Sequence, residues 1–203
     1  MPPACEHYPL SPCSTRLKYG LFKFFPVLLW ALFFVPCLQA QKPKPTDSQV
    51  KAVYLINFAR FVGWPDKLGM QRESFTICVF GPDPFGRTLD TMLAGEKIGG
   101  RSVVAKRIST AQDSFDCRIL FMSSAETGSI NRVVEAANKQ GVLTVSDMPN
   151  FATRGGMIQF VTEEKRVRFE VNLTAAQRAG LTLSSELLKV ASLVRTNETA
   201  GDQ

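Results

Sequence analysis

Short apolar runs alternate with helical segments over residues 75–145, and this alternation constrains the fold more than any other feature of the sequence. Strands are predicted where these runs are rich in β-branched and aromatic residues, at residues 75–80, 102–108, 117–122 and 142–145. Helices are predicted at residues 83–93 and 129–140. Strands that alternate with helices favour a mainly parallel central sheet with helices on both faces. The predicted fold class is therefore α/β.

A further helix is predicted before these strands. Thr46 and Gln49 stand three residues apart, as in a capping box at the start of a helix. Apolar residues then recur at helical spacing from Val50 to Val62. The helix should end before Pro65, because a proline forces the preceding residue out of the helical region.

The C-terminal third of the chain predicts a β-hairpin. Residues 157–162 and 166–173 are both strand-like, and only three residues separate them. The second strand alternates apolar and polar side chains, so it should bury one face and expose the other. Its polar face carries Arg166, Arg168, Glu170 and Asn172. A short helix at residues 174–179 and a final amphipathic helix follow, the latter with Ser184 as its N-cap and apolar residues as far as Val194.

The first 40 residues have the pattern of a secretory signal peptide. Basic side chains precede an apolar stretch at residues 24–35, and Ala40 offers a small residue at which cleavage is expected. The basic residues are Arg16, Lys18 and Lys23. Cleavage near Ala40 would leave residues 41–203 as a single exported domain.

Two alternatives to cleavage are disfavoured. An uncleaved membrane anchor would need roughly 20 apolar residues, and the uncharged stretch at residues 24–38 is shorter than that. A lipoprotein would need a small residue before its acylated cysteine, whereas Cys37 follows Pro36.

Charge and histidine content exclude several functions. The formal net charge is +6, part of which lies in the leader, and the remainder shows no run of basic residues. This argues against a nucleic-acid partner. The only histidine, His7, lies in the leader, so the exported domain lacks the commonest general base and metal ligand. We therefore expect no enzymatic activity, no metal and no cofactor.

Two cysteines, Cys78 and Cys117, remain outside the leader. In an oxidising compartment, a disulfide between them is expected. The alternative is two separate buried thiols.

Two groups of residues are candidates for a binding site. The loop with Arg154 follows the fourth predicted strand, and ligands of such sheets bind at the carboxyl ends of the strands. The polar face of the second hairpin strand could form a recognition patch with the nearby Arg178. The alternatives are a flexible turn and an ordinary solvated face. The candidate partner- or ligand-binding residues are Arg154, Gly155, Gly156, Phe160, Arg168, Glu170, Asn172 and Arg178.

Six segments of the sequence also carry a family resemblance. They are VKAVYLINFARFVGWP at residues 50–65, ICVFGPDPFG at 77–86, CRILFMS at 117–123, LTVSD at 143–147, RGGMI at 154–158 and RVRFEVNL at 166–173. In this order they resemble the YfiR-like family of periplasmic repressors, over residues 50–194. The resemblance implies a compact α/β fold with a largely parallel sheet, in a single periplasmic domain at residues 41–203.

The resemblance also implies a function. Members of this family repress a membrane-bound diguanylate cyclase of the YfiN type through its periplasmic sensor domain, which lowers cyclic-di-GMP and biofilm formation. It implies a homodimer and a disulfide between Cys78 and Cys117. A second bridge of some members lacks its cysteines here. The family's partner and ligand surfaces correspond to the segment that holds Glu170 and Arg178.

A second hypothesis needs no cyclase. The protein would then be a periplasmic small-ligand binding or sensing protein. A small anionic ligand would be held by Arg154, Arg168 and Arg178.

Overall fold

The computed structural model describes residues 44–65, 73–110, 112–123 and 130–196. The chain divides into two compact units, Met1–Pro43 and Lys44–Gln203, and all described residues belong to the second. The predicted signal peptide and its cleavage site lie outside the described residues. Within the described ranges, no helix is long and apolar enough to cross a membrane.

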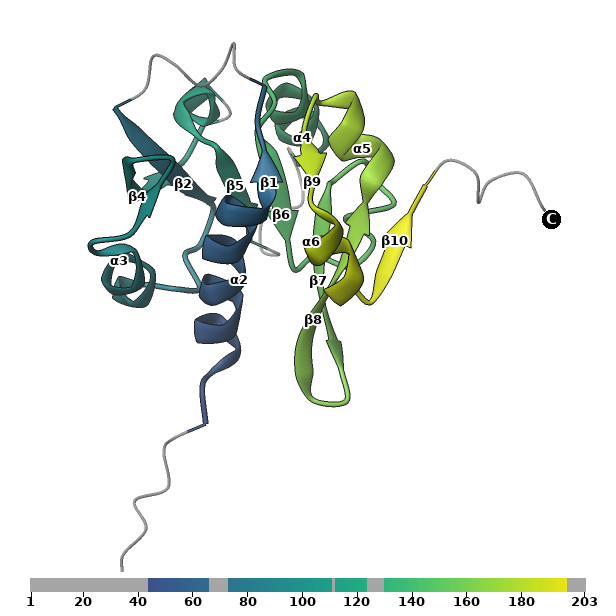
Figure 1. Cartoon of the computed structure of the whole chain (residues 1–203), viewed down its shortest axis with the longest axis horizontal. Coiled ribbons are helices and arrows are strands. Elements are labelled where there is room, and N and C mark those ends of the chain that lie inside the picture. Colours follow the sequence, from purple (N-terminus) through teal and green to yellow (C-terminus); the bar gives the residue numbers. More distant parts are fainter. Residues whose placement is uncertain (1–43, 66–72, 111, 124–129, 197–203) are drawn as a thin grey trace, which may run out of the picture. The chain divides into compact units, whose positions relative to one another are not determined.

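Eight strands of the described chain form one sheet in the order β10–β8–β7–β6–β5–β2–β4–β3 (Figure 1). Their bounds are β2 (Ser74–Phe80), β3 (Lys97–Ile98), β4 (Arg101–Ile108), β5 (Ile119–Met122), β6 (Leu143–Ser146), β7 (Ile158–Glu163), β8 (Arg166–Asn172) and β10 (Leu193–Arg195). The five strands from β4 to β7 in this order are mutually parallel. β3 is antiparallel to β4, β8 is antiparallel to β7, and β10 is parallel to β8. The mainly parallel sheet predicted from the sequence is confirmed.

Helix α2 (Asp47–Phe61) begins with the predicted capping box. The backbone N–H of Gln49 donates to the hydroxyl of Thr46, and the side-chain oxygen of Gln49 accepts from the Thr46 N–H. The helix ends before Pro65, because Val62 is already extended. The next two residues form β1 (Val62–Gly63), which pairs with β9 (Thr182–Leu183) and so ties the two ends of the described domain together.

Helices cover both faces of the sheet, as predicted (Figure 1). On one face, α2 and α3 (Arg87–Leu93) join the strands in one apolar core, in which the rings of Phe58 and Phe169 meet edge to face. On the other face, α4 (Ile130–Lys139) packs against Leu120 and its neighbours. A short 3₁₀ helix, η2 (Gln112–Asp116), precedes β5. β5 and β6 are buried throughout because both of their faces are covered.

The predicted hairpin consists of β7 and β8. Glu164 and Lys165 form its turn, with φ values of 48° and 60° that suit a tight hairpin. Val167, Phe169 and Val171 of β8 are buried, while the polar residues between them face the other way. The predicted alternation of this strand is confirmed.

Helix α3 is shorter than the sequence predicts. The expected start at residue 83 is wrong, because the side chain of Asp83 accepts a hydrogen bond from the N–H of Phe85. Gly86 then has a φ of 51°, which lies outside the helical region. The helix therefore begins at Arg87.

The last predicted helix is also shorter. α5 (Leu173–Arg178) lies close to its predicted place, and α6 (Ser185–Val190) has the predicted N-cap. The extension of α6 to Val194 is wrong. The N–H of Ser192 donates to the backbone oxygen of Phe169, and the following residues pair with β8 as strand β10.

Candidate functional site

An open hollow of about 420 Å³ is lined by the C-terminal half of α4, the loop before β7 and helix α5. It brings together three of the predicted residues, Gly155, Asn172 and Arg178. Its other lining residues are Glu135, Asn138, Lys139, Thr153, Thr174, Ala175 and Ala179. This volume is in the range of small-molecule sites.

Two asparagines hold the walls of this hollow in place. Nδ2 of Asn172 donates to the backbone oxygen of Ala152 at 2.7 Å, and its Oδ1 accepts from the N–H of Ala175 at 2.9 Å. Asn172 thereby caps α5. Nδ2 of Asn138 donates to the backbone oxygen of Gly155 at 3.0 Å. These bonds join α4, the loop and α5, so the hollow is preformed.

The charges in the hollow leave one cation unbalanced. Nζ of Lys139 lies 2.7 Å from Oε1 of Glu135, and this hydrogen bond, with the lysine charge, lowers the pKa of Glu135. Arg178 is exposed at the end of α5, and its guanidinium makes no hydrogen bond or ion pair with the residues that the structure describes. A guanidinium binds carboxylates and phosphates through two parallel hydrogen bonds. The hollow can therefore hold a small anion.

The Arg154 loop lies at the amino ends of β6 and β7, so the expectation of a loop at the carboxyl ends of the strands is wrong. After β6 the chain returns before β7 begins, and the N–H of Met157 donates to the hydroxyl of Thr144 near the start of β6. Nη2 of Arg154 donates to Oδ1 of Asn131 at 3.0 Å, and Arg154 does not line the hollow. Ligands of such sheets bind at the carboxyl ends of the strands, so this rule does not support a binding role for the Arg154 loop.

Two predicted site residues are packed inside the domain. A Cβ at Gly156 would collide with the ring of Phe151. Phe160 is 4% exposed, and its ring lies against those of Phe58 and Phe121. It pairs with Phe169 on the buried face of the hairpin, opposite to Arg168. Gly156 is buried, and Phe160 belongs to the apolar core with only its edge beside a second hollow near Lys51 and Asp147.

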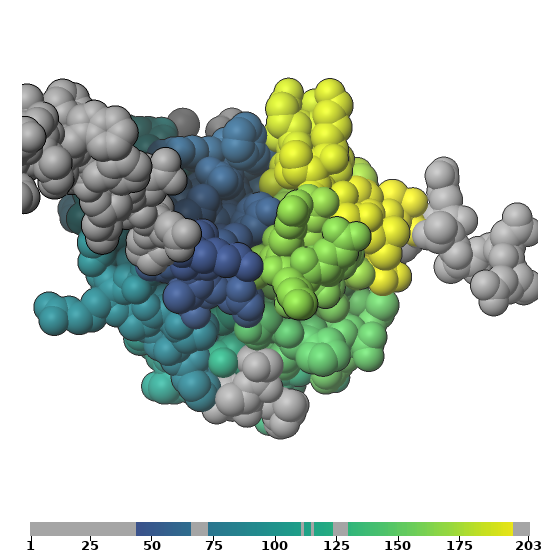
Figure 2. All heavy atoms as spheres, turned by 90° about the horizontal axis from the view of Figure 1, so that it is seen from below, coloured from purple at the N-terminus to yellow at the C-terminus, as the bar shows by residue number. Residues whose placement is uncertain are grey.

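Arg168 and Glu170 lie on the polar face of β8. Figure 2 shows the hairpin residues, in light green, at the surface between α2 in blue and the C-terminal residues in yellow. Arg168 is exposed and forms no ion pair within the described ranges. Oε2 of Glu170 lies 3.0 Å from Nη2 of Arg195 on β10, so its charge is balanced inside the domain. Of the three arginines expected to hold an anion, only Arg178 lines the hollow.

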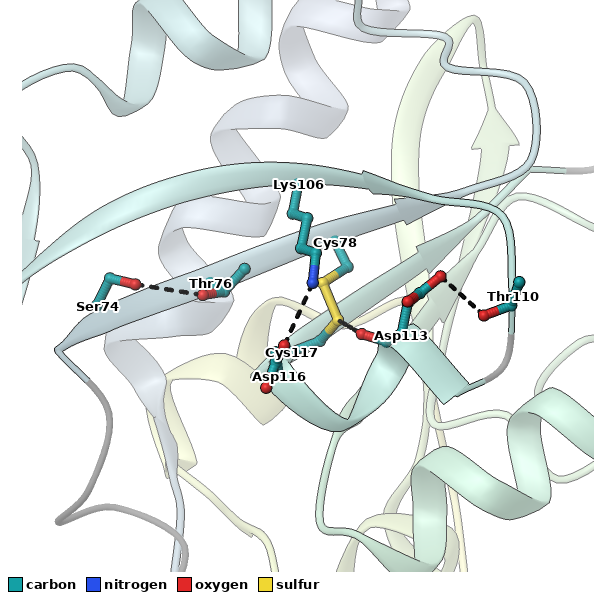
Figure 3. The surroundings of a disulfide bond; sticks show 8 residues. All are labelled: Ser74, Thr76, Cys78, Lys106, Thr110, Asp113, Asp116 and Cys117. Atoms are coloured by element: carbon teal, nitrogen blue, oxygen red, sulfur yellow. Dashed lines mark hydrogen bonds and ion pairs between the residues drawn. A yellow bond between two sulfur atoms is a disulfide. The ribbon is translucent and has the colours of Figure 1, made fainter.

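Cys78 and Cys117 form a disulfide, which decides between the two alternatives left by the sequence (Figure 3). The bond closes a separation of 39 residues, and both cysteines are buried. Cys78 lies on β2, and Cys117 lies two residues before its parallel neighbour β5. An ion pair of 3.2 Å between Lys106 and Asp116 lies beside it at the surface. The bond therefore fastens two neighbouring strands of the sheet.

The hollow and the polar face of the hairpin also involve residues that the sequence analysis did not identify. Asn138 and Thr153 line the hollow, and Arg195 balances Glu170. The helical pattern of α4 signals which of its residues are polar. Nothing in that pattern shows that they face α5, because this contact depends on the order of the strands.

A preformed hollow and a charged hairpin on one α/β sheet are features of a binding domain. Residues 48–192 match a family model, DUF4154, described as YfiR/HmsC-like. The chain belongs to this family, as the six sequence segments predicted. The family consists of periplasmic regulatory proteins rather than enzymes.

Two solved structures resemble the chain. One is a conserved domain protein from Vibrio cholerae O1 biovar El Tor, at 13% identity and a TM-score of 0.49, over 74% of this chain and 60% of that one. The other is an ABC domain in complex with L-Trp from Streptococcus pneumonia, at 13% identity and a TM-score of 0.47, over 73% and 60%. The chain thus spans about 60% of the length of either protein. At these scores, neither likeness carries an argument about function.

Proposed function

We propose that this protein represses a membrane-bound diguanylate cyclase of the YfiN type. It would contact the periplasmic sensor domain of the cyclase and so lower cyclic-di-GMP. Membership of a family of periplasmic regulators supports this proposal. Export would follow from cleavage near Ala40, which N-terminal sequencing of the protein from the periplasmic fraction can test.

The observation that carries the proposal is the exposed polar face of the hairpin. Arg168 has a free guanidinium there, and Glu170 lies two residues further along the same face. Protein-binding surfaces are enriched in arginine, which combines charge, planarity and several hydrogen-bond donors. A tight turn and a complete ladder with β7 hold this face in place.

Deletion of the gene tests the proposal directly. In a strain that carries the cyclase, cyclic-di-GMP should rise on deletion and fall when the full chain is restored. The variant Arg168→Glu should restore repression poorly, whereas Lys97→Glu, an exposed charge at the opposite end of the sheet, should restore it fully. Unchanged cyclic-di-GMP after deletion would contradict repression.

A second function, the sensing of a small anion, is favoured by the hollow. Its one unbalanced cation is Arg178, among the residues that line it. Phosphate and a set of small dicarboxylates can be screened as stabilisers in thermal unfolding. A stabilising anion should lose its effect in Arg178→Ala and keep it in Arg132→Ala, an exposed arginine of α4 that does not line the hollow. A screen without any shift would remove this function.

The homodimer remains a prediction. Light scattering of the exported domain, coupled to size exclusion, distinguishes one copy from two.

A further inference from the structure

The outer edge of β8 is only partly covered. β10 pairs with β8 from Glu170 to Asn172, and the N–H of Ser192 adds one bond to the backbone oxygen of Phe169. Beyond that point, no described strand lies beside Arg166–Arg168. Figure 1 shows the hairpin extending past the start of β10. β10 demonstrates that this edge can accept a strand.

The hydrogen-bonding groups of Val167 point to this open edge. The N–H of Asn172 donates toward β7, to Met157, whereas the oxygen of Phe169 accepts from the β10 side. In an antiparallel strand, the N–H and the C=O of one residue point to the same edge, and those of the next residue point to the other edge. Val167, two residues from Phe169, therefore presents both its donor and its acceptor outward. An added strand would find a ready hydrogen-bonding partner there.

The side chains define what such a strand should carry. Arg166 and Arg168 are exposed on one face of this edge, and neither has an ion-pair partner in the described part of the chain. Val167 lies on the opposite, apolar face. Opposite charges across neighbouring strands stabilise a sheet. An incoming strand with acidic residues at alternate positions, separated by apolar ones, would match both faces.

The same charges argue against a second copy of this chain at the edge. An antiparallel pairing of two β8 strands about Val167 would place Arg166 of one copy opposite Arg168 of the other. Like charges directly opposite each other destabilise a sheet. A different protein is therefore the better occupant.

We propose that the outer edge of β8 at Arg166–Arg168 binds an extended, acidic segment of a protein partner by adding it to the sheet. The inference rests on the proposed function, in that the sensor domain of the cyclase would supply this segment. The main-chain bonds to Val167 would provide affinity, and the two arginines would select acidic over basic strands.

Synthetic peptides test the edge without the cyclase. The probe is a nine-residue peptide of alternating glutamate and valine, compared with its lysine–valine counterpart and with a glutamate–valine peptide that has a central proline. The acidic peptide without proline should bind the full chain most tightly, measured by fluorescence anisotropy, and should slow hydrogen exchange at the amide of Val167 about tenfold, whereas the lysine–valine peptide should not bind. The proline peptide should bind about tenfold more weakly, because proline has no N–H to donate.

Charge reversal provides the matched control. The double variant Arg166→Glu, Arg168→Glu should bind the lysine–valine peptide in place of the acidic one. Lys97→Glu with Arg101→Glu, at the opposite end of the sheet, should change neither affinity. Equal binding of both peptides, or an unprotected Val167 amide, would overturn the inference. A dimer in light scattering that dissociates in the Arg166→Glu, Arg168→Glu variant would assign the edge to a second copy.

The two proposals can fail separately. If the acidic peptide binds but gene deletion leaves cyclic-di-GMP unchanged, the edge stands and repression fails. If the double variant of the arginines represses normally in cells, repression stands and the edge plays no part in it.

Discussion

Nη2 of Arg195 lies 3.0 Å from Oε2 of Glu170, and this ion pair joins β10 to the hairpin. The side chains of Arg195 and Glu170 are 39% and 18% exposed, so the pair is partly withdrawn from water. Nε of Arg195 is buried and has no hydrogen-bond partner among the described residues. This three-residue strand is held by its short ladder, by the packing of Val194 on the apolar core and by this ion pair.

Replacing Arg195 should loosen this strand. Arg195→Ala leaves Glu170 without its cation, and we expect the free energy of unfolding in urea to fall by about 1 kcal/mol. Arg168→Ala is the matched control and should change it by less than about 0.5 kcal/mol, because Arg168 is exposed and unpaired within the described ranges. Equal effects of the two changes would contradict the role of the ion pair.

Removal of the disulfide should lower the free energy of unfolding more than the loss of Arg195 does. The double change Cys78→Ala, Cys117→Ala opens a closed loop of 39 residues, and we expect a loss of about 2–4 kcal/mol in the free energy of unfolding. Urea unfolding with and without a reductant measures this. The reductant should lower the stability of the natural chain toward that of the variant and leave the variant unchanged. A variant as stable as the natural chain would show that the bond has no stabilising role.

The ion pair between Arg107 and Asp90 should make stability depend on acid pH. Arg107 donates to Asp90 and lowers the pKa of this carboxyl, while Asp90 raises the pKa of Arg107. A lowered folded-state pKa stabilises the fold above the unfolded value, near pH 4, and the contribution is lost as the pH falls through the folded value.

Asp90→Asn should therefore lose less stability than the natural chain between pH 5 and pH 2 in urea titrations. The difference should stay below about 1 kcal/mol, because the side chain of Asp90 is 49% exposed. Arg107→Gln removes the same interaction together with the ion pair between Arg107 and Asp83, and should flatten the profile at least as much. Parallel profiles for all three proteins would refute the coupling.

Gly156 should not tolerate a side chain. Gly156→Ala drives a Cβ into the ring of Phe151, and we expect a loss of about 1–3 kcal/mol in thermal or urea unfolding. Gly63→Ala is the control, since a Cβ there would meet Thr182 only at 3.6 Å, an ordinary contact. A Gly156→Ala protein with unchanged stability would mean that Phe151 moves aside freely.

Most of the fold could be predicted because its signals are local. The capping box at Thr46, the alternation along β8 and the hairpin turn each depend on residues close in sequence. The errors occurred where a distant contact overrode a local preference. The last helix stops early because Ser192 bonds to Phe169 on a strand that the helical pattern cannot reveal.

The candidate site was less predictable. Gly155, Asn172 and Arg178 were identified and do meet, but Phe160 turned out to lie in the core. The alternation along β8 showed from the sequence which of its side chains are buried. The face on which Phe160 of β7 lies depends instead on how the two strands pair.

By itself, the sequence determined the family, the α/β class, the two cysteines after residue 40 that can form a bridge and the absence of any histidine after His7. Only the tertiary structure decided that Glu170 is balanced by Arg195, that Arg178 has no ion-pair partner among the described residues of the hollow and that the Arg154 loop lies at the amino ends of its strands. The reason is physical. Helix and strand patterns arise from neighbours in the chain, but the charge balance of a side chain depends on what the order of strands places beside it.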